Sequence, residues 1–449
     1  MRKFIRQLIC PGFGLWAAAL LALFCGASGA ARADLHDLTR LGRFKKIYLL
    51  PAPNEPEIDV YVILPVGEAQ ATGPEGLAHY VEHLVASSAD QAHGSGLRAR
   101  SHNAWTSPFW TTYWNRAPLG QMDDMLRCAT ALFQPPDLSD AFMRSERDIV
   151  AREFDLRVAD TPSASLAKAA YRHLYGAHGY GRAVIGTSDS IARLTPADAL
   201  AFHARHYTPQ EAFLLIFGPI TPEEATPLLA RHLANLPQKA GPQPPQHQPL
   251  PPAPKAGLQM HLPALTRDQV LVLGHAPAPP NMPRRTLVYA MILLESILNS
   301  AQPGSLAKPL YYDDFVVSDI SIALQLLPGG QIAFQLGFSP DGDMPTAQAT
   351  TRVQQLLQDL AQNGLPDATV QSQRSILQTN SRIAQQANAR FALQVAMNSL
   401  QNLGEALDAN DHHMALHRPS TADLNALVRA LFTSPSLITA TATATKDIP

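Results

Sequence analysis

Two parts of the chain show a similar succession of apolar and polar positions. A β-rich run at Val60–Val66 is followed by a helical pattern, and the run Val270–Gly274 is followed by another. Short runs rich in Val, Ile and Leu are typical of strands, whereas apolar residues that recur every three to four positions are typical of helices. Each part therefore predicts a strand that leads into a helix.

The ends of the two parts also resemble each other. Arg193–Asp198 opens a helix that leads into the strand-like Ala212–Gly218, and Arg418–Asp423 opens a helix that leads into Leu437–Thr443. This agreement in order and position predicts an internal duplication; the alternative is two unrelated helix starts with common capping residues. Strands mixed with long helices predict an α+β fold of two similar domains, each an antiparallel-rich sheet covered on one face by helices.

A proline run separates the two parts. Seven of the thirteen residues from Pro242 to Pro254 are proline, and such a run neither pairs in a sheet nor continues a helix. It behaves as a semi-rigid extended spacer. We therefore predict an N-terminal domain at residues 34–238, a Pro-rich linker at 239–256 and a C-terminal domain of similar fold at 257–449.

The first 33 residues have the layout of a secretory signal peptide. Three basic residues precede an uncharged stretch with an apolar centre at Leu15–Cys25, and Ala31–Ala33 fits a small-x-small cleavage site. The alternatives are an uncleaved membrane anchor, for which the apolar centre is short, and a lipid anchor on Cys25. The layout predicts an exported protein with no stable membrane span after cleavage. We expect it to be periplasmic in a Gram-negative bacterium; a secreted or N-terminally membrane-anchored protein is the alternative.

The composition narrows the class of protein further. The chain has 449 residues, of which 46% are hydrophobic and 16% charged, and this excludes a mostly disordered chain. Its net charge of −2 becomes −6 once the four basic residues of the signal peptide are removed, so no nucleic-acid partner is expected. Only Cys128 of the three cysteines lies outside the signal peptide. The mature chain therefore has no internal disulfide, and Cys128 is expected to be a buried small apolar residue.

The cluster His79-Tyr80-Val81-Glu82-His83 carries the strongest chemical signal. It lies in a helical stretch opened by Gly73-Pro74, with Pro74 suited to the first helical position. Residues four apart share a helix face, so both imidazoles can reach one ion, and Glu82 can contact a water on that ion. This is the order of the inverted zinc-peptidase motif H-x-x-E-H. The alternative is a chance coincidence of residue types.

A catalytic zinc usually takes three protein ligands, so a third ligand is needed. The stretch Leu138–Arg157 is predicted to form one helix, and its Glu146 and Glu153 lie two turns apart on the same face. From periodicity alone, this face is equally consistent with a solvated charged surface.

Four further segments match the pattern of a known family. They are an Asn-Ala-x-Thr strand followed by Thr and Tyr, a Glu-x6-Glu helix, a Tyr-Gly-x4-Gly segment and a Tyr-x-Pro turn before a strand. In this sequence they are Asn103–Tyr113, Glu146–Glu153, Tyr180–Gly186 and Tyr207–Pro209. With these segments and the His79–His83 cluster, the chain resembles the insulinase/pitrilysin family of zinc metallopeptidases, of the half-length, mitochondrial-processing-peptidase-like type. The resemblance covers about residues 46–236 and continues weakly to the C-terminus.

The resemblance implies a role for each residue of the cluster. His79, His83 and Glu153 would hold one Zn²⁺ per chain, and Glu82 would be the general base. Glu146 would support the site by orienting a ligand histidine. The implied activity is that of a zinc-dependent endopeptidase acting on peptides or unfolded protein segments.

The resemblance also implies how a peptide is held. In the family the Asn-Ala strand is a sheet edge to which the substrate adds in an extended conformation, so Asn103 and Ala104 are expected to bind substrate backbone. Trp105, Trp110 and Trp114 are equally consistent with a pocket lining and with ordinary strand aromatics.

The second half departs from the family pattern. It lacks the expected Arg, since no Arg lies between Arg285 and Arg352, and Val317 stands about where a Tyr is expected. Tyr311 and Tyr312 come too early to replace that Tyr. We therefore expect the chain to be the zinc-bearing subunit of a heterodimer with a related chain that lacks the zinc motif. A homodimer is the alternative partnership, and a non-catalytic scaffold of the same fold is the alternative function.

Other histidines have weaker signals. His203 and His206 lie one turn apart without a carboxylate at ligand spacing, so no second metal site is expected there. His412 and His413 sit in a polar stretch that predicts a loop.

Overall fold

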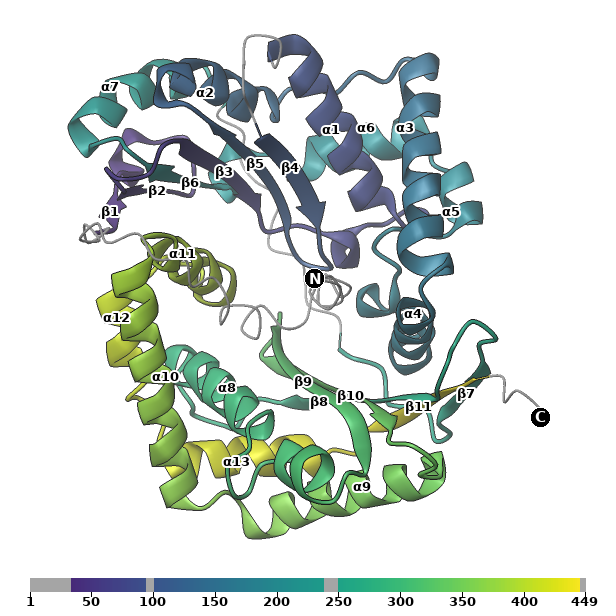
Figure 1. Ribbon diagram of the computed structural model, residues 1–449. Coiled ribbons are helices and arrows are strands. Elements are labelled where there is room, and N and C mark those ends of the chain that lie inside the picture. Colours follow the sequence, from purple (N-terminus) through teal and green to yellow (C-terminus); the bar gives the residue numbers. More distant parts are fainter. Residues whose placement is uncertain (1–33, 94–100, 238–248, 445–449) are drawn as a thin grey trace.

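The computed structural model describes residues 34–93, 101–237 and 249–444. It contains two β-sheets with helices packed against them, one sheet in each half of the chain (Figure 1). The predicted α+β class with antiparallel-rich sheets is confirmed. The predicted signal peptide and most of the predicted linker lie outside the described residues, and the domain boundaries stay predictions. No helix among the described residues is long and apolar enough to cross a membrane.

The first sheet has six strands in the order β1-β2-β6-β3-β5-β4. β2 and β6 are parallel and all other neighbours are antiparallel. Because β4 is the last strand in this order, it is an edge strand. The strands are β1 (His36–Asp37), β2 (Lys46–Pro51), β3 (Ile58–Leu64), β4 (Ser101–Thr106), β5 (Thr111–Ala117) and β6 (Phe213–Gly218).

The second sheet repeats this arrangement with five strands in the order β7-β11-β8-β10-β9. The strands are β7 (Leu258–His261), β8 (Gln269–Pro277), β9 (Val317–Leu327), β10 (Gln331–Pro340) and β11 (Ile438–Thr443). Each strand of this sheet matches one strand of β2-β6-β3-β5-β4, in the same order along the chain. The pair β7–β11 is parallel, as is the matching pair β2–β6. This repeated order is what an internal duplication requires.

The described residues of the first half form seven α-helices. They are α1 (Leu77–His93), α2 (Met122–Ala131), α3 (Asp140–Phe154), α4 (Pro162–Tyr175), α5 (Ser188–Ala192), α6 (Pro196–His206) and α7 (Pro222–Leu233). The predicted helix at Leu138–Arg157 is confirmed as α3 and a π-helical turn, Asp155–Ala159. The predicted start of α1 at Pro74 is wrong. Gly76 has a φ of +85° that turns the chain, so the helix begins at Leu77.

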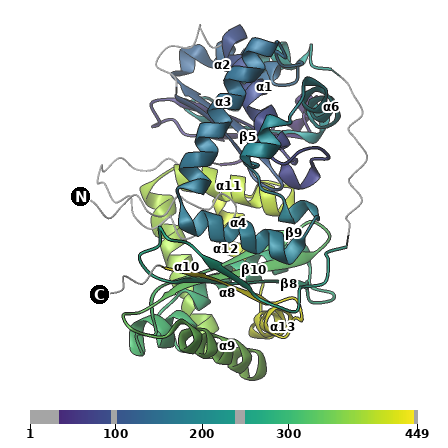
Figure 2. The same cartoon turned by 90° about the vertical axis from the view of Figure 1, so that its right-hand side faces the viewer.

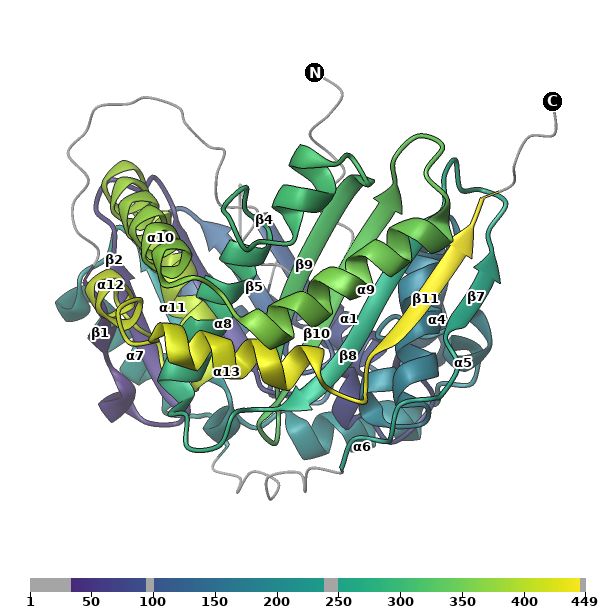
Figure 3. The same ribbon diagram turned by 90° about the horizontal axis from the view of Figure 1, so that it is seen from below.

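In the part of the second half that the structure describes there are six α-helices. They are α8 (Arg284–Leu298), α9 (Thr346–Asn363), α10 (Asp367–Ala387), α11 (Arg390–Leu403), α12 (Ala409–Ala415) and α13 (Thr421–Phe432). Helices α9 and α13 cross the outer face of the second sheet, as the view from below shows (Figure 3). The loop predicted at His412 and His413 is wrong, because both lie in α12. There His412 is buried and its Nδ1 lies 2.9 Å from the Tyr289 hydroxyl.

The first sheet is buried on both faces. Along β2, Ile47 and Leu49 face the core under α1 and α2, whereas Tyr48 and Leu50 face the other way and are equally buried. The prediction of one covered face is therefore wrong for this sheet. A near-continuous apolar run such as β3 is typical of strands that are buried on both sides.

The second cover of each sheet comes from the other half of the chain. Leu393 and its neighbours on α11 pack against the first sheet, and Leu174 and its neighbours on α4 pack against the second sheet (Figures 1 and 2). Arg390 at the start of α11 adds ion pairs of 2.9 Å to Asp59 and 2.6 Å to Glu55 in the first half. Each half therefore completes the apolar core of the other.

The edge strand of the second sheet is covered by side chains of α8 and of Asn299, the residue that follows it. The amide of Asn299 acts like a neighbouring strand, because its Oδ1 accepts from Ile322 N at 3.0 Å and its Nδ2 donates to Ile322 O at 2.9 Å. The Glu295 carboxylate accepts from Leu324 N at 2.9 Å. Because unpaired edge groups can pair with other chains, these contacts close β9 at Ile322 and Leu324.

Candidate metal centre

Helix α1 presents His79, Glu82 and His83 together. The two imidazole rings lie edge to face with their centroids 4.7 Å apart, and donor atoms of all three side chains lie within 4.8 Å of one another. His79 and Glu82 are only 6% and 4% exposed. Burying such polar groups is costly unless they find partners or a metal.

Helix α3 brings two carboxylates to this cluster. Glu153 Oε2 lies 3.5 Å from Nε2 of His79 and 3.3 Å from Nε2 of His83. Glu146 Oε2 lies 3.3 Å from the other ring nitrogen of His83, Nδ1. The structure thus brings together two imidazoles and two carboxylates from helices that are more than sixty residues apart in the sequence.

The converging atoms fit a zinc ion. Catalytic zinc takes His and carboxylate ligands in a tetrahedron with bonds of about 2.0–2.1 Å, which puts neighbouring donor atoms about 3.3 Å apart. The Nε2 atoms of His79 and His83 lie 3.5 and 3.3 Å from the shared Glu153 oxygen. The buried Nδ1 of His79 has no hydrogen-bond partner among the described residues. Glu146 is bonded to Nδ1 of His83, so it touches the back of a ligand candidate rather than the converging atoms.

The two histidines of the cluster differ in how readily they take up a proton. Burial lowers the pKa of His79 to about 3, and His83 adds to this shift. Burial also acts to lower the pKa of His83, but its bonds to Glu146 and Glu153 outweigh burial and raise the pKa to about 9. For Glu153, burial opposes ionisation, yet the two imidazoles and Arg157 hold its pKa at about 2.

Glu82 is held apart from these carboxylates. Burial raises its pKa to about 7, while His83 and a hydrogen bond from Thr106 act in the opposite direction. In that bond Thr106 Oγ1 donates to Glu82 Oε2 at 2.7 Å. Since Thr106 is the last residue of β4, Glu82 is tied to the edge strand of the first sheet.

Asn103 and Ala104 lie on β4, as predicted, and their role in binding substrate stays a prediction. Asn103 is exposed and its Oδ1 accepts from Ala104 N at 3.0 Å. Glu82 and these two residues are therefore linked by one strand, since Thr106 follows Ala104 by two positions.

The three tryptophans pack against the interface between the halves. Trp105, Trp110 and Trp114 are partly buried against the cluster formed by the first sheet and α11. Trp114 also donates from Nε1 to Asp59 at 2.7 Å and stacks on Tyr61. Trp105 and Trp114 are thus packed as structural strand aromatics, and Trp110 is packed in the same way from the turn between β4 and β5.

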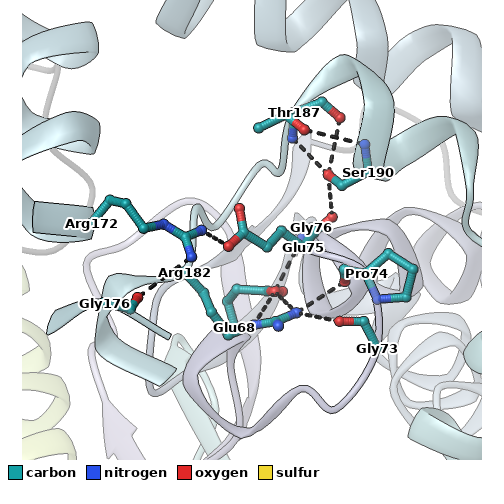
Figure 4. A network of polar contacts seen from close by, with 10 residues as sticks. All are labelled: Glu68, Gly73, Pro74, Glu75, Gly76, Arg172, Gly176, Arg182, Thr187 and Ser190. Atoms are coloured by element: carbon teal, nitrogen blue, oxygen red, sulfur yellow. Dashed lines mark hydrogen bonds and ion pairs between the residues drawn. The ribbon is translucent and has the colours of Figure 1, made fainter. Parts of the chain in front are cut away.

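A second buried network anchors the start of α1 (Figure 4). The Glu68 carboxylate is fully buried and accepts from the backbone N–H groups of Gly76 and Ala78 at 3.1 and 3.0 Å. Arg182 donates to the same carboxylate at 2.9 and 2.6 Å and also to the carbonyl of Pro74. Burial raises the pKa of Glu68 to about 7, although Arg182 and the two N–H groups act against this shift.

Neighbouring contacts complete this anchor. Glu75 forms an ion pair with Arg172, and its carbonyl accepts from Ser190 Oγ at 2.8 Å (Figure 4). Gly76 is required here, because a Cβ would lie 2.6 Å from Ile185 O and φ is +85°. The beginning of the helix that bears the cluster is thus fixed three residues before His79.

The ion pair between Glu68 and Arg182 could not be predicted from the sequence. The two residues are 114 positions apart, and neither has a local pattern that marks it. The only signal is that Arg182 lies within the Tyr180–Gly186 segment that carried the resemblance.

His203, one of the histidines with a weaker signal, lies apart from the cluster. It is buried, its Nε2 lies 3.0 Å from the Leu132 carbonyl, and its ring stacks on Tyr207.

Comparisons with known proteins identify relatives of this chain. A family model described as the peptidase M16 inactive domain matches residues 193–377. The candidate residues His79, Glu82, His83 and Glu153 lie outside that range. The chain is also 27% identical over 248 residues to the zinc protease PqqE of Helicobacter pylori, across 52% of this chain and 56% of that protein. The match therefore spans about half the length of this curated relative.

Solved structures share the fold over nearly the whole chain. A protease from Helicobacter pylori matches with a TM-score of 0.76 at 19% identity, covering 92% of this chain and 100% of that chain. The periplasmic protease PqqL from Escherichia coli matches with a TM-score of 0.72 at 16% identity, covering 92% of this chain and 48% of that chain. The chain thus has homologues among the zinc proteases of the insulinase-like M16 family and shares the fold of M16 peptidase structures.

Proposed function

We propose that this chain is a zinc-dependent endopeptidase that hydrolyses peptides or unfolded protein segments. The observation that carries the proposal is the convergence of His79 Nε2, His83 Nε2 and Glu153 Oε2, with 3.5 and 3.3 Å from the two imidazoles to the carboxylate oxygen. These three side chains would hold one Zn²⁺ per chain. The zinc-protease name of the Helicobacter pylori relative supports the same metal and reaction.

Each residue of the cluster would have a distinct role. When bound, zinc lowers the pKa of water and polarises the scissile carbonyl. Glu82, whose carboxylate is buried beside both imidazoles, would accept the proton of the attacking water and deliver it to the leaving nitrogen. Glu146 would orient His83 by accepting a hydrogen bond from its Nδ1.

The substrate would bind as an added strand at the edge of the first sheet. β4 is the last strand of that sheet, and it ends at Thr106 beside Glu82. An extended peptide paired with the backbone near Asn103 and Ala104 would run toward the cluster. On the second sheet the equivalent edge is closed at Ile322 by Asn299, the residue after α8, and at Leu324 by Glu295 of α8.

The active assembly would contain two chains. PqqL, of which this chain covers 48%, combines about twice this length in one protein, and the second half here lacks the Arg and Tyr expected from the family resemblance. We therefore propose a heterodimer with a related chain that lacks the zinc motif, with a homodimer as the alternative. The signal-peptide pattern and the likeness to PqqL, a periplasmic protease, support export to the periplasm.

A non-catalytic scaffold subunit is the second candidate function. It is favoured by the family model that matches residues 193–377, since its description names an inactive domain. Against it stands the complete set of candidate ligands and base in the first half, which a scaffold does not need.

The Glu82→Gln variant separates these two functions. We expect it to bind one zinc per chain, measured by elemental analysis, and to lose cleavage of an unfolded protein substrate. Glu211→Gln, at a partly exposed position away from the cluster, is the matched control and should cleave like the wild type. Cleavage by Glu82→Gln at the wild-type rate would refute the assigned mechanism, whereas wild-type protein that takes up no zinc would favour the scaffold. Full activity from a monomer in size-exclusion chromatography would refute the two-chain assembly.

A further inference from the structure

The hydroxyl of Thr106 donates a hydrogen bond to the carboxylate of Glu82, the proposed general base. Building on the proposed function, we propose that Thr106 is a positioning residue. Its hydroxyl would hold the carboxylate of Glu82 in the orientation needed to receive a proton. Because Thr106 belongs to β4, the same strand would place both the base and the substrate backbone.

The bond has the geometry of a strong, directional interaction. Thr106 Oγ1 donates to Glu82 Oε2 at 2.7 Å, and the two residues are 5% and 4% exposed. Hydrogen bonds from a hydroxyl to a carboxylate are short and stronger than those between neutral groups. Both side chains are buried, so the hydroxyl is the group that restrains the carboxylate on the side of β4.

A second hydroxyl on the opposite strand lies beside Thr106 but does not compete for its hydrogen. Thr106 faces Thr111 in the β4–β5 register, with 3.3 Å between the two hydroxyl oxygens. Thr111 Oγ1 donates its hydrogen to the carbonyl of Val66 at 2.9 Å, so toward Thr106 it can only accept. The single hydrogen of Thr106 therefore goes to the stronger acceptor, the Glu82 carboxylate.

The turn after β4 fixes the backbone of Thr106. Ser107 N donates to Trp110 O at 2.7 Å, and Ser107 Oγ accepts from Trp110 N at 2.9 Å. Four residues thus join β4 to β5 through a closed set of hydrogen bonds. Thr106 has a stiff β-branched side chain on a stiff backbone, and such support is what a precisely placed catalytic group needs.

Position on β4 connects the base to the substrate site. Asn103 and Ala104, the candidates for binding peptide backbone, precede Thr106 on one six-residue strand. A peptide paired with this strand would therefore take its register from the same backbone that carries the support of Glu82. Substrate and base would be aligned by one rigid element rather than by two that move independently.

The test compares Thr106→Val with Thr106→Ser. Valine keeps the branched shape and removes the hydroxyl, whereas serine keeps the hydroxyl. For Thr106→Val we expect kcat to fall about 10- to 100-fold, the effect of one hydrogen bond to a charged group, with KM unchanged within about twofold. Zinc content should stay at one per chain. Thr106→Ser should retain kcat within about threefold of the wild type.

Thr112→Val is the matched control. Thr112 lies on β5 in the same sheet and is fully buried, but its hydroxyl has no hydrogen-bond partner among the described residues. This variant should keep the wild-type kcat. If Thr106→Val does not fold, Thr106→Ala carries the same comparison. Equal loss of kcat in Thr106→Val and Thr106→Ser would show that keeping the hydroxyl does not preserve the rate, and would overturn the proposal.

Crystal structures of the variants give a readout that does not depend on activity. We expect the Glu82 carboxylate to turn away from β4 in Thr106→Val and to keep its place in Thr106→Ser. An unmoved Glu82 in Thr106→Val would overturn the positioning role. Wild-type protein that binds zinc but cleaves nothing would instead refute the proposed function, so the two failures are distinguishable.

Discussion

The buried carboxyl of Glu295 makes a quantitative prediction about stability and pH. Glu295 lies on α8, is 8% exposed and accepts one hydrogen bond, from Leu324 N at 2.9 Å. Burial raises its pKa from 4.5 to about 7, and the bond from Leu324 only partly opposes this shift. The perturbation is Glu295→Gln, which keeps the size and the acceptor oxygen but removes the titrating proton.

The sign and the size of the effect follow from linkage. The folded state binds the proton more tightly than the unfolded chain does, so this contribution is complete below about pH 4.5 and is lost as the pH rises through about 7. Raising the pKa of Glu295 from 4.5 to about 7 corresponds to roughly 3 kcal/mol of stability. Between pH 5 and pH 8, roughly 2–3 kcal/mol of it should disappear.

Urea unfolding of both proteins at pH 5 and pH 8 measures this effect. The free energy of unfolding of the wild type, relative to Glu295→Gln, should fall by roughly 2–3 kcal/mol between these pH values. Contributions of the metal cluster cancel in this difference, since both proteins carry it. Glu405→Gln, at a side chain that is 52% exposed, should show no such trend. If the difference between wild type and Glu295→Gln is the same at pH 5 and pH 8, Glu295 does not have the raised pKa in the folded protein.

Three further predictions concern the packing, the anchor and the metal. Leu393→Ala should lower the free energy of urea unfolding by about 2–5 kcal/mol, because α11 covers the first sheet. Ile383→Ala, at a position 55% exposed, is the control. Equal losses in the two variants would contradict the packing of α11 on the first sheet. Arg182→Met should cost about 3–5 kcal/mol because it leaves Glu68 buried without its cation, and a loss no larger than that of the exposed Arg193→Met would argue against the anchor. Removal of zinc by a chelator should lower the Tm, which added zinc should restore; an unchanged Tm would count against a bound metal.

Much of the candidate site could be predicted because its signals are local. His79, Glu82 and His83 lie within five residues of one helix, so the 3.6-residue period alone puts them on one side. The spacing of Glu146 and Glu153 placed both on one face of α3, but only the family resemblance singled them out from a solvated surface. The structure brings Glu153 to both imidazoles and Glu146 to one of them.

The contacts that could not be predicted join distant segments. The pair Glu68–Arg182 and the caps of Asn299 and Glu295 on β9 each depend on how two elements meet in space. The start of α1 was misplaced for a similar reason. Pro74 is a good first helical residue by itself, but Gly76 packs against Ile185 and turns the chain first.

By itself, then, the sequence determined the elements whose causes are local: the α+β class, the helix with its three polar residues, and the two similar halves suggested by repeated strand and helix starts. The packing of α11 on the first sheet and of α4 on the second sheet could be seen only in the tertiary structure, and it buries each sheet on both faces. The physical reason is that apolar periodicity records that a face is buried but not by which segment. The near-continuous apolar strands β3 and β6 indicate that the first sheet is buried on both faces, and α11 from the opposite half covers the second face.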